Sequence, residues 1–329
     1  MLHALPYELL DLICSFLTNH SDLHAAATAC AFLHNVAIHI LYKTISVRKH
    51  NLPMTTTLVS KPHLAQIVQD FKISAASDVA VPQSYFTSTL GLAISNMSSL
   101  VSLSLSLPSN QSCIALQTRL DATFPHLTRL QATIKSLDSH FFDFIGKAPN
   151  LASLVLDQVT QAPLLPPIPQ SLLPKLASFS GSAHLAGTLI PGRPVSSISL
   201  TSGLLSETLV AVLAQSSAVV LSLDAVTDSS PLPILGTLRI AMPELVDLRL
   251  GTSFDFWDES FNATFLQTMK ASLTAHTQLK SANIAGVVWK WNMIHNRRTL
   301  TSEPRIFHNE LNDNDCEWAW PQTYDSYSY

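Results

Sequence analysis

Charged residues are scarce in this chain, and their scarcity limits the kinds of protein that it can encode. They make up 13% of the 329 residues, while apolar residues make up 47%. That charged share is about half of what soluble domains usually contain. A chain so poor in charge must bury most of its leucines rather than remain a solvated tail. The net charge of −4 excludes the basic surface that nucleic-acid binding requires.

Cysteine and glycine are also few. The four cysteines lie far apart and form no C-x-x-C pair, which argues against disulfides and against a zinc or other metal site. The nine glycines form no dinucleotide or phosphate loop, and H-E-x-x-H and G-x-S-x-G are absent from the sequence. Ser182 beside His184 leaves a hydrolase as a distant alternative. We therefore expect no catalytic residue, no metal and no cofactor, and a protein that is not an enzyme.

Long hydrophobic runs are missing as well. No stretch approaches the roughly 20 apolar residues that span a bilayer. The N-terminus lacks a basic region followed by a continuous apolar one, which is the pattern of a secretion signal. These absences predict a protein of the cytoplasm, the nucleus or both, without a membrane partner.

One phrase is abundant: apolar, two others, apolar, one other, apolar, as in Leu100-x-x-Leu103-x-Leu105. Its copies begin at Val68, Leu100, Leu127, Leu151, Leu176, Val195, Ala218, Leu245 and Leu279. The steps between them are 32, 27, 24, 25, 19, 23, 27 and 34 residues, mostly within the 20–29 residue period of leucine-rich repeats. The asparagine that usually follows the last leucine is missing in most copies. The array therefore resembles an irregular leucine-rich-repeat solenoid.

The alternation within each copy predicts a short strand with every second side chain inward. Neighbouring strands must stack, because one strand and its return cannot bury that face alone. Residues 204–215 and 261–274 have the spacing of return helices, whereas the prolines between Gln158 and Pro174 predict an extended loop. Residues 287–291 suggest a last strand or cap. The fold class is thus α/β, and an unrelated α/β fold with short strands is the competing interpretation.

The first forty-odd residues have helical rather than strand periodicity. One apolar helix face is predicted from Leu9, Leu10, Ile13, Phe16 and Leu17, and a second from Leu23, Ala26, Ala27, Cys30 and Leu33. Pro6 suits a first helical turn, and Ser21 or Asp22 can cap the second helix. A third segment, residues 36–42, leads into the β-prone run Thr44–Val47.

These residues resemble an F-box over about an eighth of the chain. The resemblance is carried by Leu5-Pro6-x-Glu8-Leu9-Leu10-x-x-Ile13-x-x-x-Leu17, then Asp22-Leu23, Ala29-Cys30-Ala31-Phe32 and Leu41-Tyr42-x-x-Ile45. Where F-boxes commonly have Val-Cys-Arg-x-Trp, this chain has Ala29-Cys30-Ala31-Phe32-Leu33. The whole is similar to fungal-type F-box proteins with a degenerate leucine-rich-repeat domain.

The resemblance implies three parts: a three-helix F-box at 1–47, the repeat array at 48–291, and a cap with a partly disordered acidic and aromatic tail at 292–329. It implies a non-catalytic substrate receptor of a cullin-type (SCF) ubiquitin ligase. The protein would be a monomer in that complex, bound through a Skp-type adaptor to a cullin scaffold. The docking residues would be Leu5, Pro6, Leu9, Leu10, Ile13, Leu17, Leu23 and Phe32.

The residues between the leucines would face an open, concave side that binds an unknown protein substrate. Most are small and neutral, and the exceptions are Arg129, Gln131, Asp247 and Arg249. A pairing of Asp247 with Arg249 along one strand is the simpler explanation of the last two. The alternative function is a leucine-rich-repeat interaction scaffold outside the ubiquitin system, whose N-terminal helices are only a cap.

Overall fold

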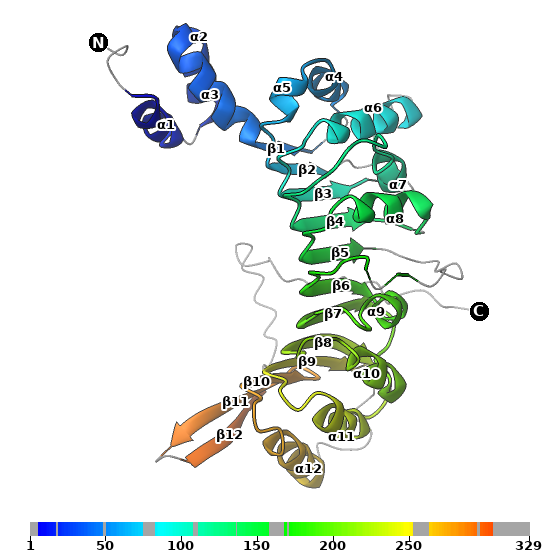
Figure 1. Ribbon diagram of the computed structural model, residues 1–329. Helices are drawn as coiled ribbons and strands as arrows, with labels where there is room; N and C mark the ends of the chain where they lie inside the picture. The colour runs from blue at the N-terminus through cyan, green and yellow to red at the C-terminus, as the bar shows by residue number, and fades with distance from the viewer. Residues whose placement is uncertain are drawn as a thin grey trace, which may run out of the picture.

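The computed structural model describes residues 6–17, 19–48, 51–74, 83–107, 111–135, 137–157, 168–169, 171–252, 263–294 and 297–304. Within these ranges the chain is a mixed α/β structure. A long sheet runs through the molecule from top to bottom, with helices on one side of it (Figure 1).

The described residues form twelve strands of this sheet, which follow one another in the order of the chain. They are β1 Thr44–Val47, β2 Asp70–Ser74, β3 Ser102–Ser106, β4 Arg129–Thr133, β5 Ser153–Asp157, β6 Ser178–Ser182, β7 Ser197–Ser202, β8 Ser222–Thr227, β9 Asp247–Thr252, β10 Ser281–Ile284, β11 Val287–Ile294 and β12 Arg297–Pro304. Strands β1 to β10 are parallel. The last two pairings are antiparallel.

Helices connect the parallel strands and cover one face of the sheet (Figure 1). They are α4 Leu52–Ser60, α5 Pro62–Ala65, α6 Gln83–Ser95, α7 Gln111–Ala115, α8 Ser139–Gly146, α9 Ala183–Leu189, α10 Glu207–Leu213, α11 Pro231–Ala241 and α12 Ala263–Thr274. One continuous apolar core lies between helices and sheet, from Leu58 to Trp289. Helices that cover one face of a parallel sheet bury that face, so the inward residues of the strands are almost all apolar, as with Phe71, Leu103 and Ile198.

Each of the nine predicted copies contains a strand, so the α/β class is confirmed. Inward residues are aligned across neighbouring strands, as with Leu103, Leu130 and Leu154. The predicted return helices are present as the shorter α10 and α12. Most of the predicted 158–174 loop lies outside the described residues.

The register predicted for the seventh copy is wrong. Leu223, rather than Leu221, pairs with Ile198 of β7 and Leu248 of β9. Val220 and Leu223 are buried, whereas Leu221 is 44% exposed. The copy therefore begins at Val220, 25 residues from both Val195 and Leu245, and the array is more regular than the sequence suggests.

The N-terminal residues form three helices: α1 Tyr7–Ser15, α2 His20–Ala29 and α3 Ala31–Lys43. Pro6 is the N-cap of α1. The N-cap of α2 is Asn19, whose side chain accepts a hydrogen bond from the Ser21 N–H, so the predicted caps Ser21 and Asp22 are wrong. Helix α3 ends directly at β1.

These helices have a small core of their own, formed by Leu10, Cys14, Leu23 and Val36. It is separate from the core of the array. The N-terminal end of the array core includes Leu58 of α4 and Ala65 of α5, and Tyr42 of α3 packs against it together with Ile45 and Val47 of β1.

At the other end, β11 confirms the predicted last strand, and Trp289 is buried in the array core. The tail, including Asp313–Trp320 and Cys316, lies outside the described residues.

Candidate protein-docking face

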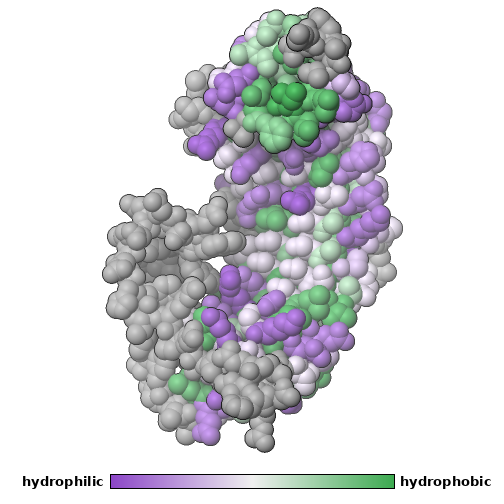
Figure 2. Space-filling model, turned by 90° about the vertical axis from the view of Figure 1, so that its left-hand side faces the viewer, coloured by the Kyte–Doolittle hydropathy of each residue, from purple (hydrophilic) through white to green (hydrophobic). Residues whose placement is uncertain are grey.

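Helix α1 exposes a row of large apolar side chains. They belong to Tyr7, Leu9, Leu12, Ile13 and Phe16. Phe32 at the start of α3 is exposed as well. Phe16 is the most open, at 75%. Figure 2, which views the molecule from the α1 side, shows a compact hydrophobic patch at the top of the molecule. We call Tyr7, Leu9, Leu12, Ile13 and Phe16 the α1 face.

Helical spacing explains why α1 is apolar on two sides. Leu10, Cys14 and Leu17 recur at intervals of four and three residues, and they lie against the small helical core. Leu9, Leu12, Ile13 and Phe16 follow the same intervals on another side and remain in solvent. In a short helix that is apolar on two sides, the inner side packs on the protein's own core. The outer side needs another apolar surface to cover it.

The structure divides the predicted docking residues into two groups. Leu9, Ile13 and Phe32 are exposed, as is Pro6. Leu10 and Leu23 are buried inside the helical unit and Leu17 is partly buried against it, so these three residues do not lie on the open side of α1. Leu5 lies outside the described residues.

Three exposed residues of this face are absent from the predicted docking set, namely Tyr7, Leu12 and Phe16, although Phe16 was predicted to lie on the apolar side of the helix. The sequence already contained the information that predicts them. The apolar residues of α1 are too many and too widely spaced to lie on one side of a helix, so some of them must be exposed. The exposed side chains together offer on the order of 500 Å² of apolar surface, near the upper end for the largest patch on a typical monomer.

The α1 face contains no reactive group in the described residues. Cys14 lies beneath it, and burial, with a smaller contribution from Asp11, raises the pKa of its thiol. A protonated, buried thiol is a weak nucleophile. The face therefore suits association with another apolar surface.

The open side of the sheet is the second candidate surface. The predicted pairing of Asp247 with Arg249 is wrong, because Arg249 forms an ion pair with Asp224 of β8 at 3.5 Å. Asp247 accepts a hydrogen bond from Ser281 Oγ at 2.7 Å. Burial raises the pKa of Asp224, against the opposing effect of Arg249. These charges are partnered across strands.

Arg129 and Gln131 lie on the same side of the sheet, at exposed positions of β4. Gln131 accepts a hydrogen bond from Ser104 Oγ at 3.4 Å and donates one to Asp157 at 3.5 Å. The structure thus places all four predicted substrate residues on one face, with Arg129 and Gln131 several strands from Asp247 and Arg249.

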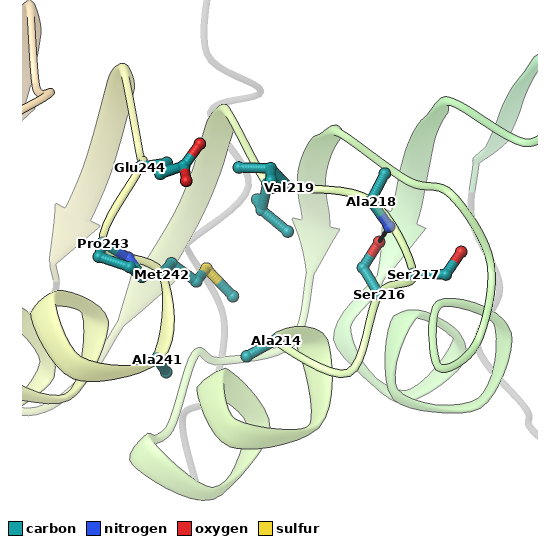
Figure 3. A pocket seen from close by; sticks show the side chains of 10 residues that line it. Ala214, Ser216, Ser217, Ala218, Val219, Ala241, Met242, Pro243 and Glu244 are labelled. Carbon is teal, nitrogen blue, oxygen red and sulfur yellow. Dashed lines mark hydrogen bonds between the residues drawn. The ribbon is translucent and has the colours of Figure 1, made fainter.

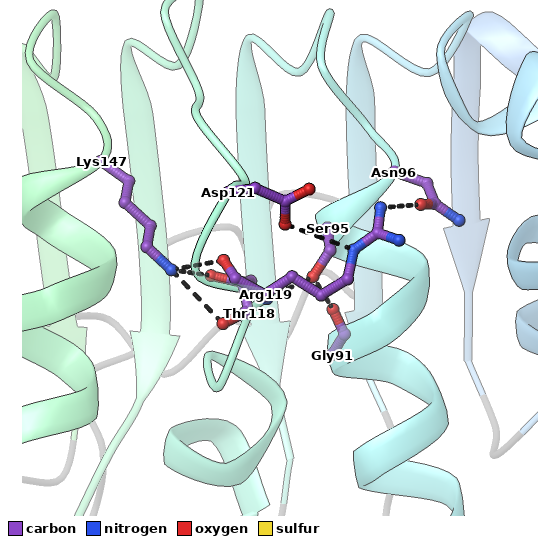
Figure 4. Close-up of polar contacts among 7 residues, drawn as sticks. All are labelled: Gly91, Ser95, Asn96, Thr118, Arg119, Asp121 and Lys147. Carbon is purple, nitrogen blue, oxygen red and sulfur yellow. Dashed lines mark hydrogen bonds and ion pairs between the residues drawn. The ribbon is translucent and has the colours of Figure 1, made fainter.

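Long polar side chains hold together the turns that precede the strands. Lys147 Nζ donates to the Thr118 carbonyl and hydroxyl and, at 2.7 Å, to the Arg119 carbonyl. Arg119 in turn donates to Asn96 Oδ1 at 2.6 Å and lies 3.8 Å from Asp121 (Figure 4). These contacts tie successive repeats together.

A shallow pocket of about 280 Å³ lies between two such turns, at residues 214, 216–220 and 241–244. Val219 and Met242 lie between the turns, with Glu244 above them (Figure 3). Its volume is slightly below the range of about 300–1,000 Å³ typical of small-molecule sites. Its lining combines small apolar residues with the polar groups of Ser216, Ser217 and Glu244.

The side chains of Ser182 and His184 have different surroundings. Ser182 Oγ accepts a hydrogen bond from the Leu185 N–H and caps α9, while His184 is exposed. In the part of the chain that the structure describes, no three His, Cys, Asp or Glu residues are placed to hold a metal. Nor does any helix of that part have the length and apolar character to cross a membrane.

A scan against protein-family models and a search of curated proteins both gave no match for this chain.

Proposed function

We propose that this protein is the substrate receptor of a cullin-type (SCF) ubiquitin ligase, in which the α1 face docks a Skp-type adaptor. The observation that carries the proposal is the apolar α1 face on a helical unit whose inner side is already filled. Among the described residues, Tyr7, Leu9, Leu12, Ile13 and Phe16 are exposed and are not part of either apolar core. The F-box resemblance of residues 5–45 supplies the identity of the partner.

The separate core supports this interpretation over a simple cap. A cap exists to cover the end of a repeat core. Here that end is covered by α4, α5, residues of β1 and Tyr42 at the end of α3. Helices α1 and α2 are therefore free for a role outside the array.

In the proposed complex the repeat array is a solenoid that holds a protein substrate, and the chain performs no catalysis itself. The open sheet side, with Arg129, Gln131, Asp247 and Arg249, would be the substrate surface. The complex would act in the cytoplasm or the nucleus.

Co-purification with a Skp-type adaptor tests the proposal. Leu9→Asp with Ile13→Asp places two carboxylates in the α1 face. Losing two buried apolar side chains, at about 1.5–3 kcal/mol each, weakens binding at least roughly a hundredfold. We expect adaptor binding to disappear while the far-UV circular dichroism spectrum stays unchanged.

Leu120→Asp with Ile240→Asp is the matched control. Both residues are exposed, at 98% and 79%, and lie in the array, so the same charge is added at apolar surface positions away from α1. This control should retain the adaptor. Equal retention by both double variants would contradict the proposal.

The alternative is a leucine-rich-repeat scaffold without adaptor. The continuous passage from α3 into β1 favours it, because it makes the helical unit an extension of the array. Such a scaffold would yield stable partners in a pull-down, but neither adaptor nor cullin among them.

A further inference from the structure

The pocket between the turns that precede β8 and β9 is lined by groups of two kinds. Val219 and Met242 contribute apolar surface, while Ser217 and Glu244 contribute exposed polar groups. Figure 3 shows the Glu244 side chain directed from its own turn toward Val219 of the preceding turn. Among the described residues, none that lines the pocket is basic. The pocket therefore holds a negative charge without a positive one beside it.

Glu244 is an exposed carboxylate without a partner of its own. Among the described residues, no ion pair or hydrogen bond engages it. The acidic residues of the neighbouring strands differ in this respect, because Asp224 pairs with Arg249 and Asp247 accepts a hydrogen bond from Ser281. The apolar walls exclude part of the surrounding water. A cation that enters the pocket therefore interacts with Glu244 more strongly than it would on an open surface.

Two helices end at the pocket, and both make it more negative. Ala241 and Met242 are the last residue and the C-cap of the eleven-residue helix α11, and Ala214 is the C-cap of α10. The last carbonyls of a helix have no partner within the helix, and the helix dipole gives this end a partial negative charge. The last turn of α10 has no basic residue, and Arg239 in the last turn of α11 does not line the pocket. These features are those of a cation site.

The volume of the pocket suits one long side chain. At about 280 Å³ it is smaller than typical small-molecule sites, yet larger than the roughly 150 Å³ cavity that admits benzene. An arginine side chain is only slightly larger than benzene. Its apolar stem can lie against Val219 and Met242, while its planar, multiply donating head reaches Glu244 and the helix-end carbonyls together. The compact ammonium of lysine cannot serve both at once.

We propose that this pocket binds an arginine side chain presented by a partner protein. Three apolar residues at or next to its lining are exposed: Val219 at 47%, Leu221 at 44% and Ile240 at 79%. The partner residues that flank the arginine can cover this apolar surface, which a free small cation would leave in water. Arginine is also among the residues that most often dominate protein interfaces. The pocket lies in the array, so the inference does not depend on adaptor docking.

Peptide arrays probed with the full chain test the proposal. Short peptides with a central arginine and varied flanking residues are compared with the same peptides carrying lysine or citrulline, which has the shape of arginine without its charge. The best arginine peptide is then titrated by fluorescence anisotropy. We expect citrulline to weaken its binding about tenfold or more, because a charge-assisted hydrogen-bonded contact is lost. Absence of binding by any arginine peptide, or equal binding of the citrulline or lysine peptides, would overturn the proposal.

Substitutions in the pocket locate the site. Glu244→Gln should weaken the arginine peptide by a similar factor and leave the citrulline peptide unchanged. Val219→Lys adds a positive charge to the lining and should exclude arginine as well. Asp143→Asn, at an exposed position of α8, removes one negative charge elsewhere and should bind normally. Binding of the arginine peptide by Glu244→Gln at wild-type strength would place the contact outside this pocket and refute the assignment.

Folding and adaptor docking are measured separately from peptide binding. Glu244 and Val219 are exposed, so both variants should unfold at the wild-type urea midpoint. The peptide assay contains no adaptor, and neither substitution lies in the helical unit. Failure of the arginine site would therefore leave adaptor co-purification intact, and failure of adaptor docking would leave peptide binding intact.

Discussion

Leu9 and Leu10 are neighbours with opposite surroundings, and truncating each in turn tests the helical unit. Leu10 is completely buried in the core of four residues, whereas Leu9 is 45% exposed. A buried leucine replaced by alanine costs about 2–5 kcal/mol. Leu9→Ala removes a side chain already half in water, so its cost should stay below about 1 kcal/mol.

The loss at Leu10 is large for so small a core. A destabilisation of about 3 kcal/mol raises the local opening constant on the order of 100-fold. Because this core is separate from that of the array, the opening should remain local. Leu10→Ala should therefore loosen α1 and α2 and leave β3 to β9 protected.

Amide hydrogen exchange followed by mass spectrometry measures both effects in one experiment. Peptides from residues 7–29 should exchange much faster in Leu10→Ala and almost normally in Leu9→Ala. Equal acceleration in the array would refute the separate core. Faster exchange in Leu9→Ala than in Leu10→Ala would refute the assignment of the inner and outer sides of α1.

The corrected register of β8 and two buried polar side chains lead to the remaining predictions. Val220→Ser should lower the urea midpoint clearly and Leu221→Ser hardly at all, since only Val220 is buried; the reverse order would contradict the register. Arg193 is 2% exposed and donates hydrogen bonds to three main-chain carbonyls. Arg193→Met should therefore lower the free energy of unfolding by about 3 kcal/mol or more in a urea titration. An unchanged midpoint would show that these bonds contribute nothing. Burial, above all, holds the pKa of His276 below its ordinary value of 6.5. The unfolded chain then binds the proton more readily, so the contribution of His276 is complete above about pH 6.5 and declines below it, down to the folded-state pKa. Thermal unfolding of wild type and His276→Gln from pH 8 to pH 5 should show a steeper decline in the wild type than in the variant, and equal declines would contradict the assignment to His276.

The repeated phrase was sufficient to predict the strands. Apolar residues at every second position indicate a strand, and this pattern lies within the segment itself. It was ambiguous at residues 218–225. Both Ala218-x-x-Leu221-x-Leu223 and Val220-x-x-Leu223-x-Ala225 satisfy it. Hydrogen bonding to β7 and β9 decides between them, and this information lies in the neighbouring strands rather than in the segment.

The charged residues of the open sheet side illustrate a similar limit. Asp247 and Arg249 are neighbours along one strand, and their pairing is the natural expectation from sequence. In the folded sheet Arg249 finds Asp224 across the strands instead, because directly opposed residues of adjacent strands are closer than residues two apart along one strand.

The amino-acid sequence by itself determined the α/β class, the helical start of the chain and the nine strands that follow, because periodicity is a local property. It also indicated which partner to test, through the F-box resemblance of residues 5–45. Only the tertiary structure decided which side of α1 is open. That helix is apolar on two sides, and the side that remains in solvent depends on where Leu23 and Val36 of the other helices lie.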